Sequence, residues 1–244
     1  IAAVLLLSGC SKAPEAEGSD TVLSDYLDKV ESFEGVTHQF GQEESRVLFG
    51  EKLLATVFYP KTGINELDSA IKKYIDDVIT TAQIESALRE LKEAAELLIY
   101  YNSYINRSGI VSVEFTEHYS DSGLAHPVDL TRTFVAHKKS GEILSIDEIL
   151  KKGKREEIEK RLTEEFDIDR EFNNGDLLEQ WIIADNSLKI ILTRGEFLPM
   201  SDGTKSYTFT QKETKEFLKE EPGVELVLEN VLEQKPEWLL DIIK

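Results

Sequence analysis

The sequence predicts an α+β fold, in which helices pack on one face of antiparallel sheets in two lobes of similar size. Apolar and polar residues alternate with period two in three segments, at 97–105, 110–119 and 128–138. Helical spacing of apolar residues is found instead in two others, at 65–79 and 154–166. Residues typical of turns separate these segments, as expected where strand pairs are interrupted by helices.

The N-terminal part favours short strands followed by a helix. Residues 21–34 carry a brief helical stripe, whereas 36–40 and 47–59 favour strands, the latter ending at Pro60 because proline cannot continue a ladder. Asn65 suits a helix N-cap, and a second helical stretch is expected from Ile84 to Ala95. The first helix has one apolar face, formed by Leu67, Ile71, Tyr74, Ile75, Val78 and Ile79.

The sequence of the middle of the chain predicts a hairpin, a further strand and two helices. The strands at 97–105 and 110–119 flank Asn106-Arg107-Ser108-Gly109, a candidate hairpin turn. Ser145 and Glu148 have capping-box spacing, so a helix should begin there, before the helix at 154–166.

The C-terminal part predicts another hairpin and a last capped helix. Strands at 181–183 and 187–193 flank the Asp185-Asn186 turn, and 205–210 favours a further strand. Thr210 and Glu213 have capping-box spacing for a helix that runs to Leu218.

Composition excludes several classes of protein. The 244 residues include 47 Asp and Glu against 28 Lys and Arg, a formal net charge of −19, which argues against a nucleic-acid partner. The single cysteine excludes an internal disulfide and a cysteine-clustered zinc site. The longest apolar run is too short for a transmembrane helix.

The N-terminal sequence predicts a lipid anchor. Residues 1–9 are apolar and then small, as at the end of a signal peptide, and we take this leader as truncated because no initiator Met or basic region precedes it. Leu7-Ser8-Gly9-Cys10 matches a bacterial lipobox, so Cys10 is the predicted lipidation site. A buried N-terminal strand with a core cysteine is the alternative, which the solvated segment that follows disfavours.

The expected domain organisation follows from these features. After the signal peptide at 1–9 come a lipidated tether at 10–34, an N-terminal α+β lobe at 35–127, a C-terminal α+β lobe at 128–222 and a helical tail at 223–244. The predicted location is extracytoplasmic, on a bacterial membrane.

Three stretches together resemble a bacterial envelope family, in the order expected across roughly residues 36–220. They are the strand 54–59 with Pro60, the loop 119–127 with the segment 141–150, and the strand 188–192 with the loop 196–203. The family includes the lysozyme-sensing, RsiV-like ectodomain of the anti-sigma-V factor and the non-catalytic N-terminal region of some polysaccharide deacetylases. Many of its members are lipoproteins of unknown function.

The resemblance implies a two-lobed ectodomain rather than a reaction. No cytoplasmic sigma-binding segment and no deacetylase domain correspond to any part of this sequence. The two loops are the expected contact regions, and the candidate partner-binding residues are Tyr119, Ser122, Gly123, His126, Pro127, Phe197, Pro199 and Met200.

No catalytic motif is recognisable. His118 and His126 flank Asp121, yet the spacing fits no established zinc pattern, and a loop histidine bonded to backbone is the favoured interpretation of His126. The sequence contains no nucleophile elbow or phosphate-binding glycine loop, and we expect no metal or other cofactor.

Two functions of different classes remain open. The first is a non-catalytic, lipid-anchored ectodomain that binds a protein or glycan partner at the cell envelope, with a cationic protein of the lysozyme type suggested by the acidic charge. The second is a metal-assisted peptidoglycan hydrolase or deacetylase-like enzyme that uses His118, His126 and nearby acids. A structural lipoprotein that assembles with other envelope components is a third possibility.

Overall fold

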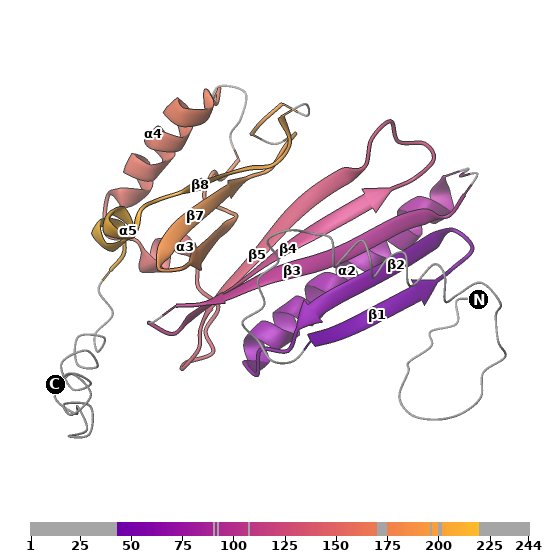
Figure 1. Ribbon diagram of the computed structural model, residues 1–244, viewed down its shortest axis with the longest axis horizontal. Helices are drawn as coiled ribbons and strands as arrows, with labels where there is room; N and C mark the ends of the chain where they lie inside the picture. The colour runs from indigo at the N-terminus through magenta and orange to yellow at the C-terminus, as the bar shows by residue number, and fades with distance from the viewer. Residues whose placement is uncertain are drawn as a thin grey trace, which may run out of the picture.

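The computed structural model describes residues 43–219 except 90, 92, 107, 170–174, 196, 200 and 201. Cys10, the leader, the tether, the C-terminal tail and Met200 therefore lie outside the described residues. The described chain forms a five-stranded sheet, a three-stranded sheet and four helices (Figure 1). This architecture confirms the predicted mixed α+β class.

The larger sheet has the strand order β1-β2-β3-β4-β5. Its strands are β1 (Glu43–Phe49), β2 (Leu53–Pro60), β3 (Ala95–Ile105), β4 (Ile110–Ser120) and β5 (Val128–His137). Neighbours are antiparallel except β2 and β3, which are parallel and are joined through the long helix α2 (Asn65–Leu88). A parallel pair needs such a crossover, since a tight turn can only reverse the chain.

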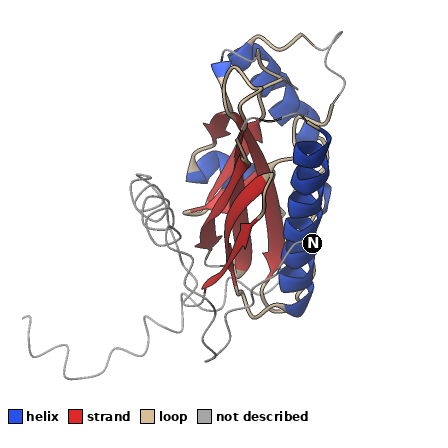
Figure 2. Ribbon diagram, turned by 90° about the vertical axis from the view of Figure 1, so that its right-hand side faces the viewer, coloured by secondary structure: helices blue, strands red, loops and turns tan. Residues whose placement is uncertain are grey.

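Helix α2 covers one face of this sheet, running alongside it in Figure 2. Leu67, Ile71 and Ile75 are almost fully buried, which confirms the apolar face expected from the sequence. The helix begins at Asn65 itself, with Ile64 as the N-cap, so the predicted capping role of Asn65 is wrong. Asp68 instead organises the entry, because its carboxylate accepts hydrogen bonds from the backbone N–H groups of Thr62 and Gly63.

Two other local expectations in this region are wrong. The segment 47–59, expected as one strand, is divided between β1 and β2 by a tight turn in which Gly50 N–H donates to the Leu53 carbonyl at 2.9 Å. The second helical stretch expected from Ile84 to Ala95 is not found among the described residues of this segment. Helix α2 itself continues to Leu88, with Ile84 and Leu88 56% and 81% exposed, and Ala95 begins β3.

The smaller sheet is antiparallel with the order β6-β7-β8. Its strands are β6 (Trp181–Ala184), β7 (Ser187–Leu192) and β8 (Lys205–Thr208), and the helices beside it are α3 (Ile146–Ile149), α4 (Lys154–Phe166) and α5 (Gln211–Phe217). Asp185 and Asn186 both have positive φ, at 49° and 62°, which confirms the predicted hairpin turn. Ile158 and Leu162 of α4 are fully buried in the core beneath this sheet.

The predicted caps are formed. Thr210 accepts a hydrogen bond from the Glu213 N–H, while the Glu213 carboxylate accepts from the Thr210 N–H and hydroxyl. The Thr210 partners and the Arg161 guanidinium lower the pKa of Glu213 to about 2. Ser145 and Glu148 form the corresponding box at α3, a helix of a single turn.

Hydrogen bonds from β6 and the residue before it join the two sheets. Ile183 N–H donates to Ser112 Oγ at 3.0 Å in a buried position, and Trp181 N–H donates to Thr133 Oγ1 at 3.1 Å. Thr133 N–H in turn donates to the Gln180 side chain at 2.8 Å. Strand β5, expected in a C-terminal lobe that starts at residue 128, pairs with β4 along most of its length. The boundary expected at 127/128 therefore runs through the larger sheet.

Candidate functional site

The two faces of the larger sheet differ in polarity. Along β4, Val111, Val113 and Phe115 point toward α2 and are fully buried. The alternate residues of β4 on the other face are Ser112, Glu114, Thr116 and His118. The register places Tyr100 of β3 and Thr131 of β5 on either side of Thr116, so hydroxyl groups cross three neighbouring strands. The smaller sheet covers only part of this polar face.

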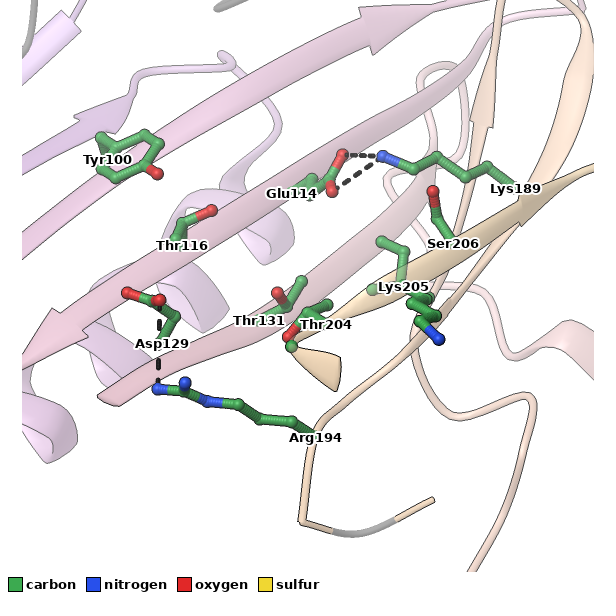
Figure 3. Close-up of a pocket in the computed structure, with 12 residues that line it drawn as sticks. Tyr100, Glu114, Thr116, Asp129, Thr131, Lys189, Arg194, Thr204, Lys205 and Ser206 are labelled. Carbon is green, nitrogen blue, oxygen red and sulfur yellow. Dashed lines mark hydrogen bonds and ion pairs between the residues drawn. The ribbon is translucent and has the colours of Figure 1, made fainter. Parts of the chain in front are cut away.

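A cleft of about 370 Å³ lies where the polar face meets β7 and β8 (Figure 3). One wall carries Tyr100, Glu114, Thr116, Asp129 and Thr131, and the other carries Lys189, Ile191, Arg194, Gly203, Thr204, Lys205 and Ser206. The volume is near the lower end of the roughly 300–1,000 Å³ that ligand sites occupy. The lining is mostly polar, so the cleft suits a ligand rich in hydrogen-bonding groups.

An ion pair connects the two walls of the cleft. Lys189 Nζ lies 2.9 and 3.0 Å from the two carboxylate oxygens of Glu114 (Figure 3). The Glu114 side chain is only 11% exposed and that of Lys189 is 23% exposed. Such a shielded carboxylate needs its cation, because burying an unpaired charge is costly. The pair therefore fixes β7 against β4.

Arg194 stands at the end of the cleft and links the two loops that the sequence singled out. Its Nη2 donates to the Pro127 carbonyl at 2.7 Å and lies 4.0 Å from the Asp129 carboxylate. Asp129 also contacts His118 Nδ1 at 2.6 Å. Arg194 Nε is buried with no hydrogen-bond partner within the described part of the chain, so the guanidinium is only partly satisfied. The loop after β4 and the loop after β7 thus meet at one end of the cleft.

The first of these loops is organised by Asp121. Its carboxylate accepts hydrogen bonds from Gly123 N–H, Tyr119 OH and Arg89, and these interactions lower the pKa of Asp121 against the opposing effect of desolvation. Tyr119 is half-buried at the end of β4, whereas Gly123 and the loop residues Ser122, His126 and Pro127 lie near or at the surface. The candidate partner-binding residues of this loop are therefore accessible to a partner, and the hydrogen bonds of Asp121 hold the loop in a defined turn.

The candidate partner-binding residues of the second loop, 196–203, differ in their exposure. Phe197 is only 6% exposed and packs in the core beneath the smaller sheet with Leu198. In this structure Phe197 is a core residue, and its assignment as a partner-binding residue stays a prediction that its burial disfavours. Pro199 is exposed, and Met200 lies outside the described residues.

The arrangement of His118, His126 and Asp121 does not form the metal site considered from the sequence. His118 is bonded to Asp129, and Asp121 is occupied by Arg89 and its own loop. Within the described ranges, no group of three or more His, Cys, Asp or Glu side chains is arranged to hold a metal ion.

Sequence reasoning missed Glu114, Lys189 and Arg194. Glu114 and Lys189 pair although they are 75 residues apart in the sequence, and no local pattern reveals such a pair. A usable signal was present in β4, where Ser112, Glu114 and Thr116 alternate with large apolar residues. An aligned polar set on a central strand indicates a face that is partly solvated.

Comparison with known proteins identifies the fold but no close relative. No protein-family profile and no curated protein matches the sequence. A crystal structure of a DUF3298 family protein from Pseudomonas aeruginosa PAO1 is similar, with a TM-score of 0.53 and 12% identity over 75% of this chain and 95% of that chain. A member of the same family from Bacteroides fragilis NCTC 9343 has a TM-score of 0.50 and 9% identity over 75% and 96% of the two chains. This chain therefore shares the fold of a domain family of unknown function.

Proposed function

We propose that this protein is a non-catalytic binding domain of the bacterial cell envelope, held at a membrane by a lipid on Cys10. Its partner contacts the cleft between the two sheets and the loops at its end, and the cleft itself receives a cell-wall glycan. The observation that carries the proposal is the Arg194–Pro127 hydrogen bond, which brings both loops to the same polar cleft.

The chemistry of the cleft favours a glycan. Tyr100, Thr116 and Thr131 offer hydroxyl groups that both donate and accept hydrogen bonds, as a sugar ring requires. Lys205 on the opposite wall pairs with Asp202 at 2.8 Å, but its side chain is 41% exposed and can also meet a ligand carboxylate, which cell-wall sugars carry. A polar cleft of this size therefore fits one end of an acidic glycan better than an apolar ligand.

The proposed location rests on the lipobox at 7–10 and the solvated segment after it. The similar structures are DUF3298 family proteins of two bacteria, and they support the fold alone; the envelope location and the RsiV-like relationship are part of the proposal. Among the helices that the structure describes, none has the length and apolar character needed to cross a membrane.

A lysozyme-type muramidase is a second candidate partner, favoured by the net charge of −19. An acidic surface accelerates encounter with a cationic protein, and salt weakens that effect. Capture of lysozyme on the immobilised protein at low salt, lost at high salt, is the expected result. Absence of capture at low salt would refute this version.

The hydrolase alternative receives little support from the carboxylates of the cleft. Glu114 lies opposite Thr133, so the backbone positions of Glu114 and Asp129 are four residues apart along the strands, roughly 13 Å at about 3.3 Å per residue. Glycosidases place their two carboxyl groups about 5–9.5 Å apart. Both carboxylates also have cationic or imidazole partners already.

The glycan proposal is tested by calorimetric titration with the disaccharide of N-acetylglucosamine and N-acetylmuramic acid. We expect saturable binding that weakens about tenfold in Lys205→Met, the effect of one charge-assisted contact. Lys72→Met is the matched control, because Lys72 is exposed on α2, away from the cleft. No saturable binding, or equal binding by both variants, would overturn the proposal.

A further inference from the structure

A second cavity, of about 570 Å³, lies between α2 and β5, at the edge of the larger sheet that β5 forms. Helix α2 contributes Ala70, Lys73, Tyr74 and Asp77, β4 contributes Glu117, and β5 contributes Leu130, Thr131, Arg132 and Phe134. Glu179, Gln180 and Thr193 complete the lining. None of the loop residues chosen from the sequence reaches this cavity.

The charges of this cavity do not cancel. Its lining includes the acids Asp77, Glu117 and Glu179 and the bases Lys73 and Arg132. Lys73 pairs with Asp77 at 2.8 Å, and Arg132 pairs with Glu179 at 2.9 Å. Among these lining residues, Glu117 is therefore the acid without an ion-pair partner.

Glu117 is held by a neutral group instead. Tyr74 OH donates to its Oε1 at 2.7 Å, across from α2 to β4. Burial raises the pKa of Glu117, while the Tyr74 hydrogen bond and the more distant Arg132 charge partly oppose that rise. A carboxylate in such a position gains free energy from any cation that reaches it.

The walls around Glu117 suit an apolar stem. The rings of Tyr74 and Phe134 lie 5.5 Å apart, centre to centre, and Leu130 is 45% exposed although it is a large apolar residue. Aromatic faces attract organic cations, and Arg132 already lies over the Phe134 ring, 6.0 Å from its centre. The face of Tyr74 and the exposed leucine are therefore the surfaces on which a further stem can pack. A metal ion would need more oxygen ligands than one free carboxylate supplies.

We infer that this cavity binds the side chain of a lysine or arginine on a partner protein, with Glu117 as the counter-ion and Tyr74, Phe134 and Leu130 around the stem. The site goes beyond the proposed function, since it shares only Thr131 with the lining of the glycan cleft and adds a contact for a protein. The net negative charge of the chain favours approach of such a cationic partner.

The test uses small probes and nuclear magnetic resonance titration of the protein. The probes are acetyl-arginine methylamide and its neutral isostere acetyl-citrulline methylamide, which differ in charge and hardly in shape. We expect the arginine probe to shift the signals of Tyr74, Leu130 and Phe134 saturably, and to bind at least tenfold more tightly than the citrulline probe.

Two variants locate the interaction. Glu117→Gln retains an acceptor for Tyr74 and should weaken the arginine probe about tenfold, whereas Glu165→Gln, an exposed change of the same type on α4, should leave it unchanged. Lys205→Met should not alter this binding, so failure of the glycan cleft and failure of this site are distinguishable. Equal binding of the two probes, no binding, or full binding by Glu117→Gln would overturn the inference.

Discussion

The two faces of the five-stranded sheet are built from the same strands, but one face forms the hydrophobic core and the other contacts the smaller sheet and lines the cleft. Toward α2, β4 presents Val111, Val113 and Phe115, which are sealed from solvent. Toward the smaller sheet, the same strand presents Ser112, Glu114 and Thr116, which bond to other elements or line the cleft. The period of two along one strand thus separates the stabilising core from the polar site.

Apolar packing stabilises the face toward α2, whereas polar interactions hold the smaller sheet on the other face. On the α2 face, the rings of Tyr74, Tyr101 and Phe134 pack around Phe115 with centroids 5.3–6.1 Å apart. On the cleft face, individual hydrogen bonds and one ion pair position the smaller sheet. We therefore expect substitutions of the fully buried residues on the first face to affect mainly stability, and those on the second face to affect mainly the docking of the smaller sheet and binding in the cleft.

The largest expected effect is that of Phe115→Ala. Removing a fully buried ring leaves a cavity among three aromatic neighbours and should lower the free energy of unfolding by about 3–5 kcal/mol. Thr116→Ala, one residue away on the cleft face, should cost less than about 1 kcal/mol. Urea denaturation measures both, and similar losses in the two variants would contradict the contrast between the faces.

The next effect is that of Lys189→Met, which leaves the Glu114 carboxylate shielded and without its cation. We expect a loss of about 2–3 kcal/mol, smaller than for a fully buried pair because Lys189 is 23% exposed. Adding Glu114→Gln to Lys189→Met should recover part of that loss. Lys205→Met is the control in the same cleft, with an expected change within about 0.5 kcal/mol. A double variant as unstable as the sum of the single ones would show that the two residues act separately.

A smaller effect is expected from Ser112→Ala, which removes the acceptor of the buried Ile183 N–H. The cost of one unsatisfied buried donor is about 1–2 kcal/mol. Hydrogen exchange of the Ile183 amide should accelerate, while that of amides in α2 should change little. Unaltered exchange at Ile183 would mean that this bond does not secure β6 to β4.

The smallest expected effect is the pH dependence of stability that arises from the raised pKa of Glu117. Its raised pKa means that the folded state favours the protonated form, so its contribution to stability decreases as pH rises from the ordinary value to the raised one. Tyr74→Phe removes a hydrogen bond to the carboxylate and should raise the pKa of Glu117 further. Carbon-detected titration of the Glu117 carboxyl measures both shifts, and a pKa at or below the ordinary value would contradict the assignment.

Local signals predicted much of the fold. The Asp185-Asn186 turn, the Thr210–Glu213 cap and α4 depend on residues close in the sequence, and all three are formed as expected. The apolar face of α2 also follows from its periodicity. In each case the local preference and the tertiary environment favour the same structure.

Tertiary pairing decided what could not be predicted. The segment 47–59 has strand-forming residues on both sides of Gly50-Glu51-Lys52, and the antiparallel pairing of β1 with β2 shows that the chain reverses at this point. Phe197 has the composition of a surface loop around it, yet it is covered by the core beneath the smaller sheet. The cleft depends on Arg194 and Lys189 reaching β4 and the loop before β5, which no short segment encodes.

The assignment of β5 to the larger sheet has a practical consequence for dissecting the protein. Cutting the chain between Pro127 and Val128 would remove the outer neighbour of β4 and expose a long row of backbone donors and acceptors. Bare strand edges template pairing between molecules, so the first fragment should precipitate or assemble into oligomers. The second fragment would carry β5 without β4, the strand with which it pairs, and we expect neither piece to fold alone.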